Sequence, residues 1–215
     1  MIASEDASRG RGQLALELRM PPDQRFDTFV AAPVAALAQL RALAQGGSRE
    51  SFYVEGAHGT GKSHLLIGLG TAAAEHGYRV RYVTAAALVN ELAEAADDRI
   101  LGKVIARYGR IDLLCLDELG YIELDRRGAE LLFQVFTERE EKNSIAIASN
   151  AAFSEWAQAF TGPRLCAAIV DRLTYDAHII TTGTGSYRLK STAARRGAMP
   201  AGKNGKESTE KGTPS

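Results

Sequence analysis

The chain has 215 residues, enough for one α/β domain with a sizeable core. Its 26 basic and 26 acidic residues give a formal net charge of zero, so any contact with nucleic acid needs a local patch or an assembly of subunits. Two cysteines make no disulfide framework, and neither a secretion signal nor an apolar run of roughly 20 residues is found. We therefore expect a reduced, cytoplasmic setting without membrane contact.

Short patterns at the N-terminus precede the main body of the chain. Residues 1–12 are polar and dotted with glycine, which predicts disorder. Gln13–Leu18 alternates apolar and polar residues, as an edge strand or a short docking peptide would. A helix-like stretch follows at 31–44 and is closed by two glycines. We take residues 1–46 as an N-terminal arm.

Strand and helix patterns then alternate along residues 47–190, which we expect to form one domain. This alternation predicts an α/β fold with a parallel five-stranded sheet and helices on both faces. Residues 186–190 could add a short final strand, and residues 191–215 are expected to form a disordered basic tail, either solvated or a DNA-binding arm. The expected strands are 51–55, 78–83, 111–116, 144–149 and 177–182, and the expected helices are 62–76, 85–96, 98–108, 126–141, 153–160 and 164–173.

A glycine-rich stretch between the first strand and its helix fits G-x-x-x-x-G-K-[ST], the phosphate-binding loop of nucleoside triphosphatases. Glycines let the backbone N–H groups turn toward an anion, and the helix that follows adds the positive end of its dipole. Lys62 is predicted to reach the β- and γ-phosphates of ATP, and Ser63 to place its hydroxyl on Mg²⁺. The predicted phosphate-binding residues are Gly56, Ala57, His58, Gly59, Thr60, Gly61, Lys62, Ser63 and His64.

Two acidic residues follow the apolar strand 111–116. A parallel sheet would place Asp117 beside the phosphate loop, where this carboxylate can hold Mg²⁺ through water. Glu118, one position further, can polarise a water for attack on the γ-phosphate. A general base at this position favours ATP hydrolysis over phosphoryl transfer to a metabolite. The predicted metal ligands are therefore Ser63 and Asp117, and Glu118 is the predicted catalytic base.

Two further polar residues are candidates for catalysis. Asn150 ends the fourth strand, where its amide could orient the attacking water, although asparagine at a strand end is also ordinary turn chemistry. Arg172 follows Asp171, and it could either pair with that aspartate at the surface or act across a subunit boundary as an arginine finger.

From about residue 77 to residue 190, the chain resembles the IstB-like helper ATPases of bacterial transposons, which are AAA+ proteins related to the DnaC helicase loader. The resemblance implies a three-layer P-loop NTPase with an AAA+ core, ATP-dependent oligomerisation on duplex DNA, and assistance to a partner transposase. By position, Asn150 matches the sensor residue of the family and Arg172 matches its trans-acting arginine. The residues that carry the resemblance are 78–89, 117–121, 124–129, 149–150, 153–156, 171–173 and 186–189.

Residues 13–76 instead resemble Hda, the DnaA-related initiator regulator. Gln13–Leu18 is similar to its sliding-clamp-binding peptide, and Pro21–Phe29 is similar to the segment that follows. The helical partner-binding domain with which IstB-like helpers usually begin is not found. A natural fusion, a divergent relative and an artificial hybrid would each explain this pattern.

Three functions remain open at this point. The first is an IstB-like ATPase that assembles on duplex DNA and assists transposition, with helicase loading as a related role. The second is an Hda-like regulator that docks on the sliding clamp and holds nucleotide. The third is a nucleotide-gated adaptor with negligible turnover. Only 25 residues follow Lys190, so we expect no C-terminal helical lid, which favours the first over the second. Glu118 argues against the third.

Overall fold

The computed structural model describes residues 24–26, 34–45, 50–121, 124–140, 142–151, 167–168 and 177–183. Several expected segments lie outside these residues: the docking peptide Gln13–Leu18, the final strand at 186–190 and the tail at 191–215. The expected helices at 153–160 and 164–173 also lie outside them, apart from residues 167–168, which are helical. Among the described helices, none is both long and apolar enough to cross a membrane.

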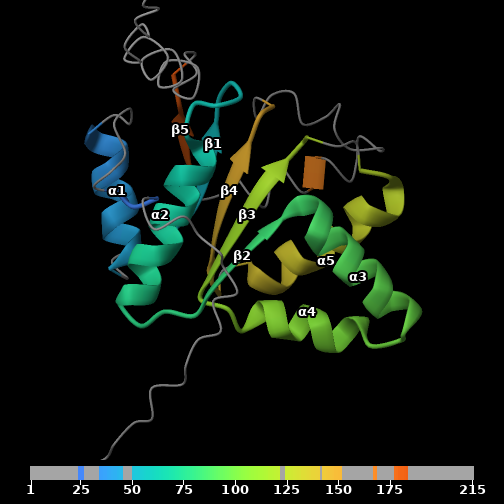
Figure 1. Cartoon of the computed structure of the whole chain (residues 1–215). Helices are drawn as coiled ribbons and strands as arrows, with labels where there is room; N and C mark the ends of the chain where they lie inside the picture. Colours follow the sequence, from blue (N-terminus) through green and yellow to red (C-terminus); the bar gives the residue numbers. More distant parts are fainter. Residues whose placement is uncertain are drawn as a thin grey trace, which may run out of the picture.

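Five parallel strands form one sheet in the order β2-β3-β4-β1-β5. Because every pair is parallel, all five carboxyl ends lie at the same edge of the sheet, at the top of Figure 1. The strands are β1 (Ser51–Glu55), β2 (Val80–Thr84), β3 (Leu113–Leu119), β4 (Ser144–Ser149) and β5 (Ala177–Thr181). The predicted α/β class and five-stranded parallel sheet are confirmed.

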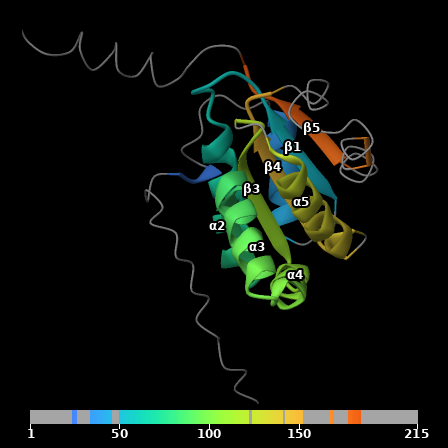
Figure 2. The same cartoon turned by 90° about the vertical axis from the view of Figure 1, so that its right-hand side faces the viewer.

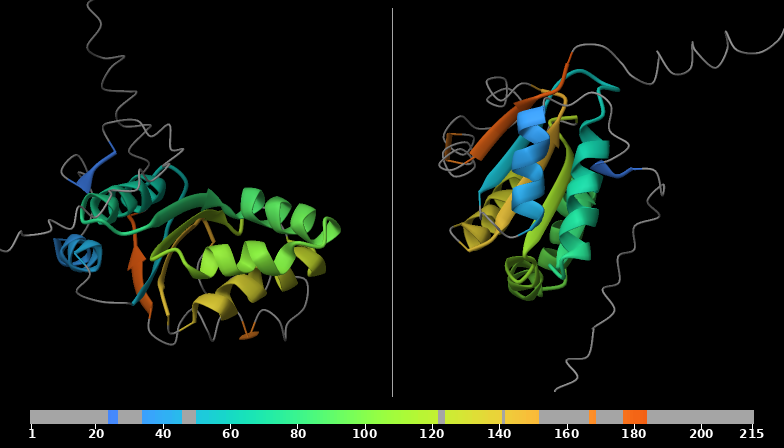
Figure 3. Two further views of the ribbon diagram at one scale, coloured as in Figure 1. Left: turned by 90° about the horizontal axis from the view of Figure 1, so that it is seen from below. Right: turned by 90° about the vertical axis from the view of Figure 1, so that its left-hand side faces the viewer.

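Helices cover both faces of this sheet, as the sequence predicts. On one face lie α1 (Val34–Ala44) and α2 (Lys62–Glu75), which are seen in front of the strands in the right view of Figure 3. On the other face lie α3 (Ala85–Asp97), α4 (Leu101–Gly109) and α5 (Arg126–Arg139), and Figure 2 shows α3 and α5 in front of β3 and β4.

Two apolar cores result, one on each face of the sheet. Strand β3 contributes to both, because Leu114 and Leu116 pack on the α3–α5 side while Leu113 and Cys115 pack on the α1–α2 side. A strand buried on both faces is almost continuously apolar, which is why the run before Asp117 shows no alternation.

The connection between α3 and α4 differs from the prediction. Thr84 caps α3 as expected, accepting a hydrogen bond from the N–H of Ala87. The next helix was expected from residue 98, but α4 begins at Leu101. Arg99 ends α3 in a left-handed turn at φ 60, and the N–H of Ile100 donates to the carbonyl of Ala95 at 2.8 Å. This hydrogen bond, together with a left-handed residue after the last turn, is a common way for a helix to end. The left-handed residue is usually glycine, so the arginine at this position gave no sign of the helix end in the sequence.

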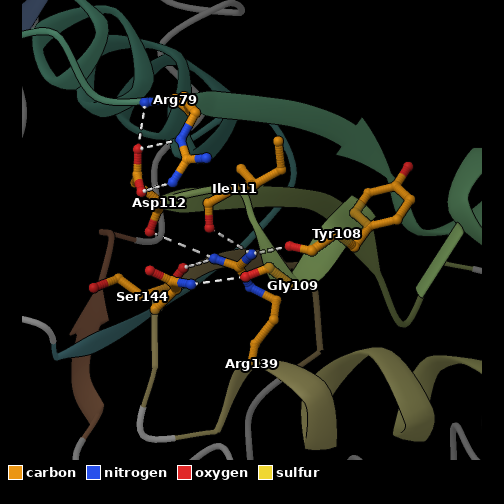
Figure 4. A network of polar contacts seen from close by, with 8 residues as sticks. Arg79, Tyr108, Gly109, Ile111, Asp112, Arg139 and Ser144 are labelled. Carbon is orange, nitrogen blue, oxygen red and sulfur yellow. Dashed lines mark hydrogen bonds and ion pairs between the residues drawn. The ribbon is translucent and has the colours of Figure 1, made fainter. Parts of the chain in front are cut away.

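Strand β2 also begins later than expected, at Val80 instead of Tyr78. The carboxylate of Asp112 accepts a hydrogen bond from the backbone N–H of Arg79 at 2.8 Å and pairs with the Arg79 guanidinium at 2.7 Å (Figure 4). The side chain of Asp112 therefore takes a backbone donor that would otherwise be available to the sheet ladder.

A buried arginine ties the amino ends of the strands together. Arg139, at the end of α5, is 1% exposed, and its guanidinium donates to the carbonyls of Tyr108, Ile111 and Ser144 at 2.5, 2.8 and 2.6 Å (Figure 4). A longer contact, 3.5 Å, reaches the carbonyl of Asp112. Burial lowers the pKa of Arg139 to about 10, so the group remains charged at neutral pH. One cation thus satisfies carbonyls from the end of α4 and the starts of β3 and β4.

Replacing Arg139 with methionine should lower the free energy of unfolding by at least about 3 kcal/mol, because several buried carbonyls lose their donor. Urea unfolding of the purified variant measures this. Arg126→Met is the matched control, since Arg126 is exposed and its pair with Glu130, one turn away, lies at the surface. A stability for R139M equal to that of R126M would contradict the interpretation.

Candidate nucleotide-binding site

The predicted phosphate loop joins β1 to α2 at the carboxyl edge of the sheet (Figure 1). Gly61 precedes the first residue of α2 with a φ of 95°, in the left-handed region that favours glycine. Leu65 donates the first helical hydrogen bond to the carbonyl of Gly61 at 3.0 Å, which leaves the N–H groups of Lys62 and Ser63 at the open end of the helix. Such an end is suited to binding an anion such as phosphate.

The side chain of Lys62 folds back over this loop. Its ammonium donates to the carbonyls of Gly56 and Ala57 at 2.7 and 2.8 Å, and the residue is 7% exposed. Burial lowers the pKa of Lys62, and the negative charge of Asp117 acts in the opposite direction. The predicted phosphate-binding cation and the predicted metal ligand therefore lie within electrostatic reach of one another.

Thr182, the residue after β5, contacts the end of β1 and the phosphate loop. Its backbone N–H donates to the carbonyl of Glu55 at 2.8 Å, and its hydroxyl lies 2.7 Å from the hydroxyl of Thr60. A β-carbon on Gly56 would approach the Thr182 hydroxyl oxygen to 2.2 Å. Thr182 was not among the predicted site residues. It was expected as the last residue of the fifth strand, 177–182, whereas β5 ends at Thr181, and only the pairing of β5 with β1 gives the position of Thr182 a meaning.

Asp117 and Glu118 lie at the same edge but in opposite environments. Asp117 is 4% exposed, whereas Glu118 is exposed to solvent. One carboxylate oxygen of Asp117 accepts the backbone N–H of Glu118 at 2.8 Å, and the other accepts the hydroxyl of Tyr82 at 2.5 Å. Tyr82, like Thr182, is a residue of the site that the sequence did not predict.

Strand β3 does not stop at residue 116 as predicted but continues to Leu119, so the two acids lie inside the strand. A register shift against β4 between Leu116 and Leu119 accompanies this, and Glu118 adopts a φ of 59°. A non-glycine residue in this region is strained, and such strain is often found at functional sites.

The oxygen donors near the loop fit Mg²⁺. A hydroxyl from Ser63 and a carboxylate from Asp117 are hard ligands of the kind this ion prefers, with phosphate and water completing its shell. Within the described residues, no three His, Cys, Asp or Glu side chains gather as a protein-only metal site.

The order of the strands brings Asn150 into this group. β4 lies between β1 and β3, so the exposed Asn150 that follows it stands between the phosphate loop and the acid pair. The side chain of His58 is exposed. The ring of His64 contacts the carbonyl of Arg25 at 2.9 Å, so its side chain is engaged with that segment. Arg172 lies outside the described residues.

The same substitution at two glycines should have opposite effects. Gly56→Ala should destabilise the fold by about 1–3 kcal/mol, because the new methyl group overlaps the Thr182 hydroxyl at an unfavourable φ of 149°. Gly102→Ala should stabilise it by about 0.5 kcal/mol, since Gly102 is helical with nothing within 4 Å of the added carbon. Thermal and urea unfolding of both variants will show whether the signs differ; equal effects would count against the close approach.

Similar folds are found among solved structures of DnaA and DnaC proteins. DnaA from Aquifex aeolicus bound to AMPPCP superposes with a TM-score of 0.66 at 22% identity, over 84% of this chain and 56% of that one. The DnaC helicase loader gives a TM-score of 0.63 at 21% identity, over 74% of this chain and 97% of that one. At these identities the likeness shows the fold alone, and it agrees with the predicted α/β fold with a parallel sheet covered by helices.

Sequence relatives extend further along the chain. An insertion sequence ATP-binding protein of Sinorhizobium fredii is 34% identical over 209 residues, covering 92% of this chain and 69% of that protein. The family described as IstB-like ATP binding protein matches residues 12–195. This match includes the N-terminal part that resembles Hda, which favours a divergent relative over a fusion of two families. The chain therefore belongs to the family of IstB-like ATP-binding proteins.

Proposed function

We propose that this protein binds ATP with Mg²⁺ at the carboxyl edge of the sheet and hydrolyses it, and that it assembles on duplex DNA to assist a transposase. The observation that carries the ATPase assignment is the convergence of Lys62, Asp117, Glu118 and Asn150 at one edge of one sheet. In this arrangement the phosphate loop would hold the phosphates. Mg²⁺ held by Ser63 and Asp117 would supply neutralisation of the charge that develops on them.

The two neighbouring acids lie in different environments, which suit them to different roles. Buried Asp117 stays close to Lys62 and the loop, where it would hold Mg²⁺. Glu118 is turned to solvent, where it can accept a proton from the attacking water. Asn150, which follows β4 between the loop and the acids, would orient that water. Arg172 would act from a neighbouring subunit.

Glu118→Gln should lower the rate of ATP hydrolysis at least about 100-fold, because the amide cannot accept the proton. ATP binding should persist, since Glu118 does not hold the phosphates. A phosphate-release assay gives the rate, and a fluorescent ATP analogue gives the affinity. Glu94→Gln, which changes an exposed carboxylate in the third turn of α3, is the matched control. Hydrolysis by E118Q at the wild-type rate would remove Glu118 from the mechanism.

The DNA part of the proposal rests on the relatives and on one surface. The relative from Sinorhizobium fredii is named as an ATP-binding protein of an insertion sequence. Two exposed basic residues lie on α4, Lys103 and Arg107, and the exposed Arg110 follows directly as its C-cap in helical conformation. The spacings of four and three place these residues on one side of the helix. We call these three residues the α4 basic surface. Arg107 is paired with Glu91, so part of its charge is already compensated.

The α4 basic surface lies away from the nucleotide. α4 ends at Gly109 and leads into the start of β3, at the amino ends of the strands (Figure 1). Bound nucleotide would not touch DNA held there. With zero net charge, one subunit offers only a few phosphate contacts, so we propose that ATP acts by assembling subunits whose basic surfaces bind the duplex together.

Particle mass measured with a non-hydrolysable ATP analogue should increase to that of a large assembly when duplex DNA is added.

The double variant Lys103→Glu with Arg110→Glu should reduce the affinity for DNA at least about tenfold, because negative charges that repel phosphate replace positive charges that bind it. Arg41→Glu with Lys142→Glu changes the net charge equally on other exposed surfaces and should bind nearly as wild type. A persistent monomer or dimer, or equal losses in both double variants, would contradict the DNA proposal. A persistent monomer or dimer would in addition favour the clamp-docking alternative through Gln13–Leu18.

A further inference from the structure

Tyr82 in β2 donates its hydroxyl to Asp117 in β3 at 2.5 Å. The pairing of the two strands explains how these residues meet. Tyr82 is opposite Cys115, and Asp117 is two residues further along β3, opposite Thr84. Because side chains alternate along a strand, Tyr82 and Asp117 point to the same face of the sheet. The thiol of Cys115 contacts the carbonyl of Leu66, so this is the face covered by α2.

The tyrosine ring is held in place by that face. Tyr82 packs against the apolar core formed by α1, α2 and the strands. Phenylalanine would fill the same space, so the packing does not need a hydroxyl. The hydroxyl serves Asp117 instead. Burial and the hydrogen bond to Asp117 both raise the pKa of Tyr82, so the group stays protonated and remains a donor at physiological pH.

The two hydrogen bonds fix Asp117 through both of its oxygens. One oxygen accepts the hydroxyl of Tyr82, and the other accepts the backbone N–H of Glu118. The plane of the carboxylate is therefore defined before any ion binds. Each carboxylate oxygen has a second lone pair, so both can still accept from water bound to Mg²⁺.

We propose that Tyr82 is a positioning residue, which orients Asp117 for Mg²⁺ and thereby sets the affinity for the metal–nucleotide complex. The proposal rests on the nucleotide binding put forward above. Partners that orient a metal ligand typically change metal affinity 10- to 100-fold when they are removed. The effect should be confined to Mg²⁺, because Tyr82 is not part of the phosphate loop.

The test is Tyr82→Phe, which removes the hydroxyl and keeps the ring. Binding of a fluorescent ATP analogue is followed by anisotropy, first in EDTA and then across a titration of Mg²⁺. The Mg²⁺ concentration that gives half of the full response should rise about tenfold in Y82F, while affinity in EDTA stays at the wild-type value. A change in EDTA affinity equal to the change in Mg²⁺ would overturn the assignment, because it would indicate damage to the loop as a whole.

Tyr108→Phe is the matched control. The Tyr108 hydroxyl also donates to a carboxylate, that of Glu91 at 2.6 Å, but this pair joins α4 to α3. Y108F should bind the analogue as wild type does, both with and without Mg²⁺. Thermal unfolding of both variants reports the cost of losing one such hydroxyl, independently of the metal.

A second variant tests whether Tyr82 works through Asp117. In an Asp117→Asn background, the further change Tyr82→Phe should have no effect on the Mg²⁺ response, because the group it orients has been altered. An equal loss in both backgrounds would overturn the proposal. If the wild type binds the analogue and Y82F matches it at every Mg²⁺ concentration, the Tyr82 assignment alone fails. If the wild type binds no nucleotide under any condition, the proposed function fails first.

Discussion

The position of β1 between two parallel neighbours is the constraint on which the candidate site depends. Glu55, its last residue, pairs with Ser149 of β4 on one side and with Thr181 of β5 on the other. The three strands therefore end at the same level, and the residues that follow them are brought together. On the far side of β4, Leu119 pairs with the same Ser149, which brings the acid pair of β3 to that level as well. Backbone ladders thus bring the residues of the site to one level, and side-chain contacts such as that of Tyr82 with Asp117 orient them there.

A deeply buried charge is tolerated within this frame because its partners are fixed. A buried carboxylate without partners is strongly disfavoured, yet Asp117 has a donor for each oxygen and a nearby ammonium. Its neighbour Glu118 has the opposite environment, since the left-handed turn in β3 directs it to solvent. Under the proposed function, these two environments would suit two adjacent acids to different tasks, Asp117 to holding Mg²⁺ and Glu118 to accepting a proton from water.

Features encoded in short stretches could be predicted from the sequence, whereas features that join distant stretches could not. The bounds of β1 and β4 match the predicted strands, because each is an apolar run with clear turn residues on either side. The left-handed turn at Arg99 was missed since no glycine marks it. The contacts of Tyr82 with Asp117 and of Thr60 with Thr182 span 35 and 122 residues, and they depend on a strand order that no local pattern encodes.

The contacts of Lys62 have a consequence for selectivity. In the structure its ammonium donates to two carbonyls of its own loop, so two of its three N–H groups already have acceptors and a ligand competes with them for part of the hydrogen bonding. Binding at the loop is thus an exchange, and its net free energy is the difference between two sets of hydrogen bonds. A singly charged anion gains little from such an exchange, while a polyphosphate that also engages the helix end and a metal ion gains much more. We therefore expect the loop to bind a polyphosphate in preference to a singly charged anion.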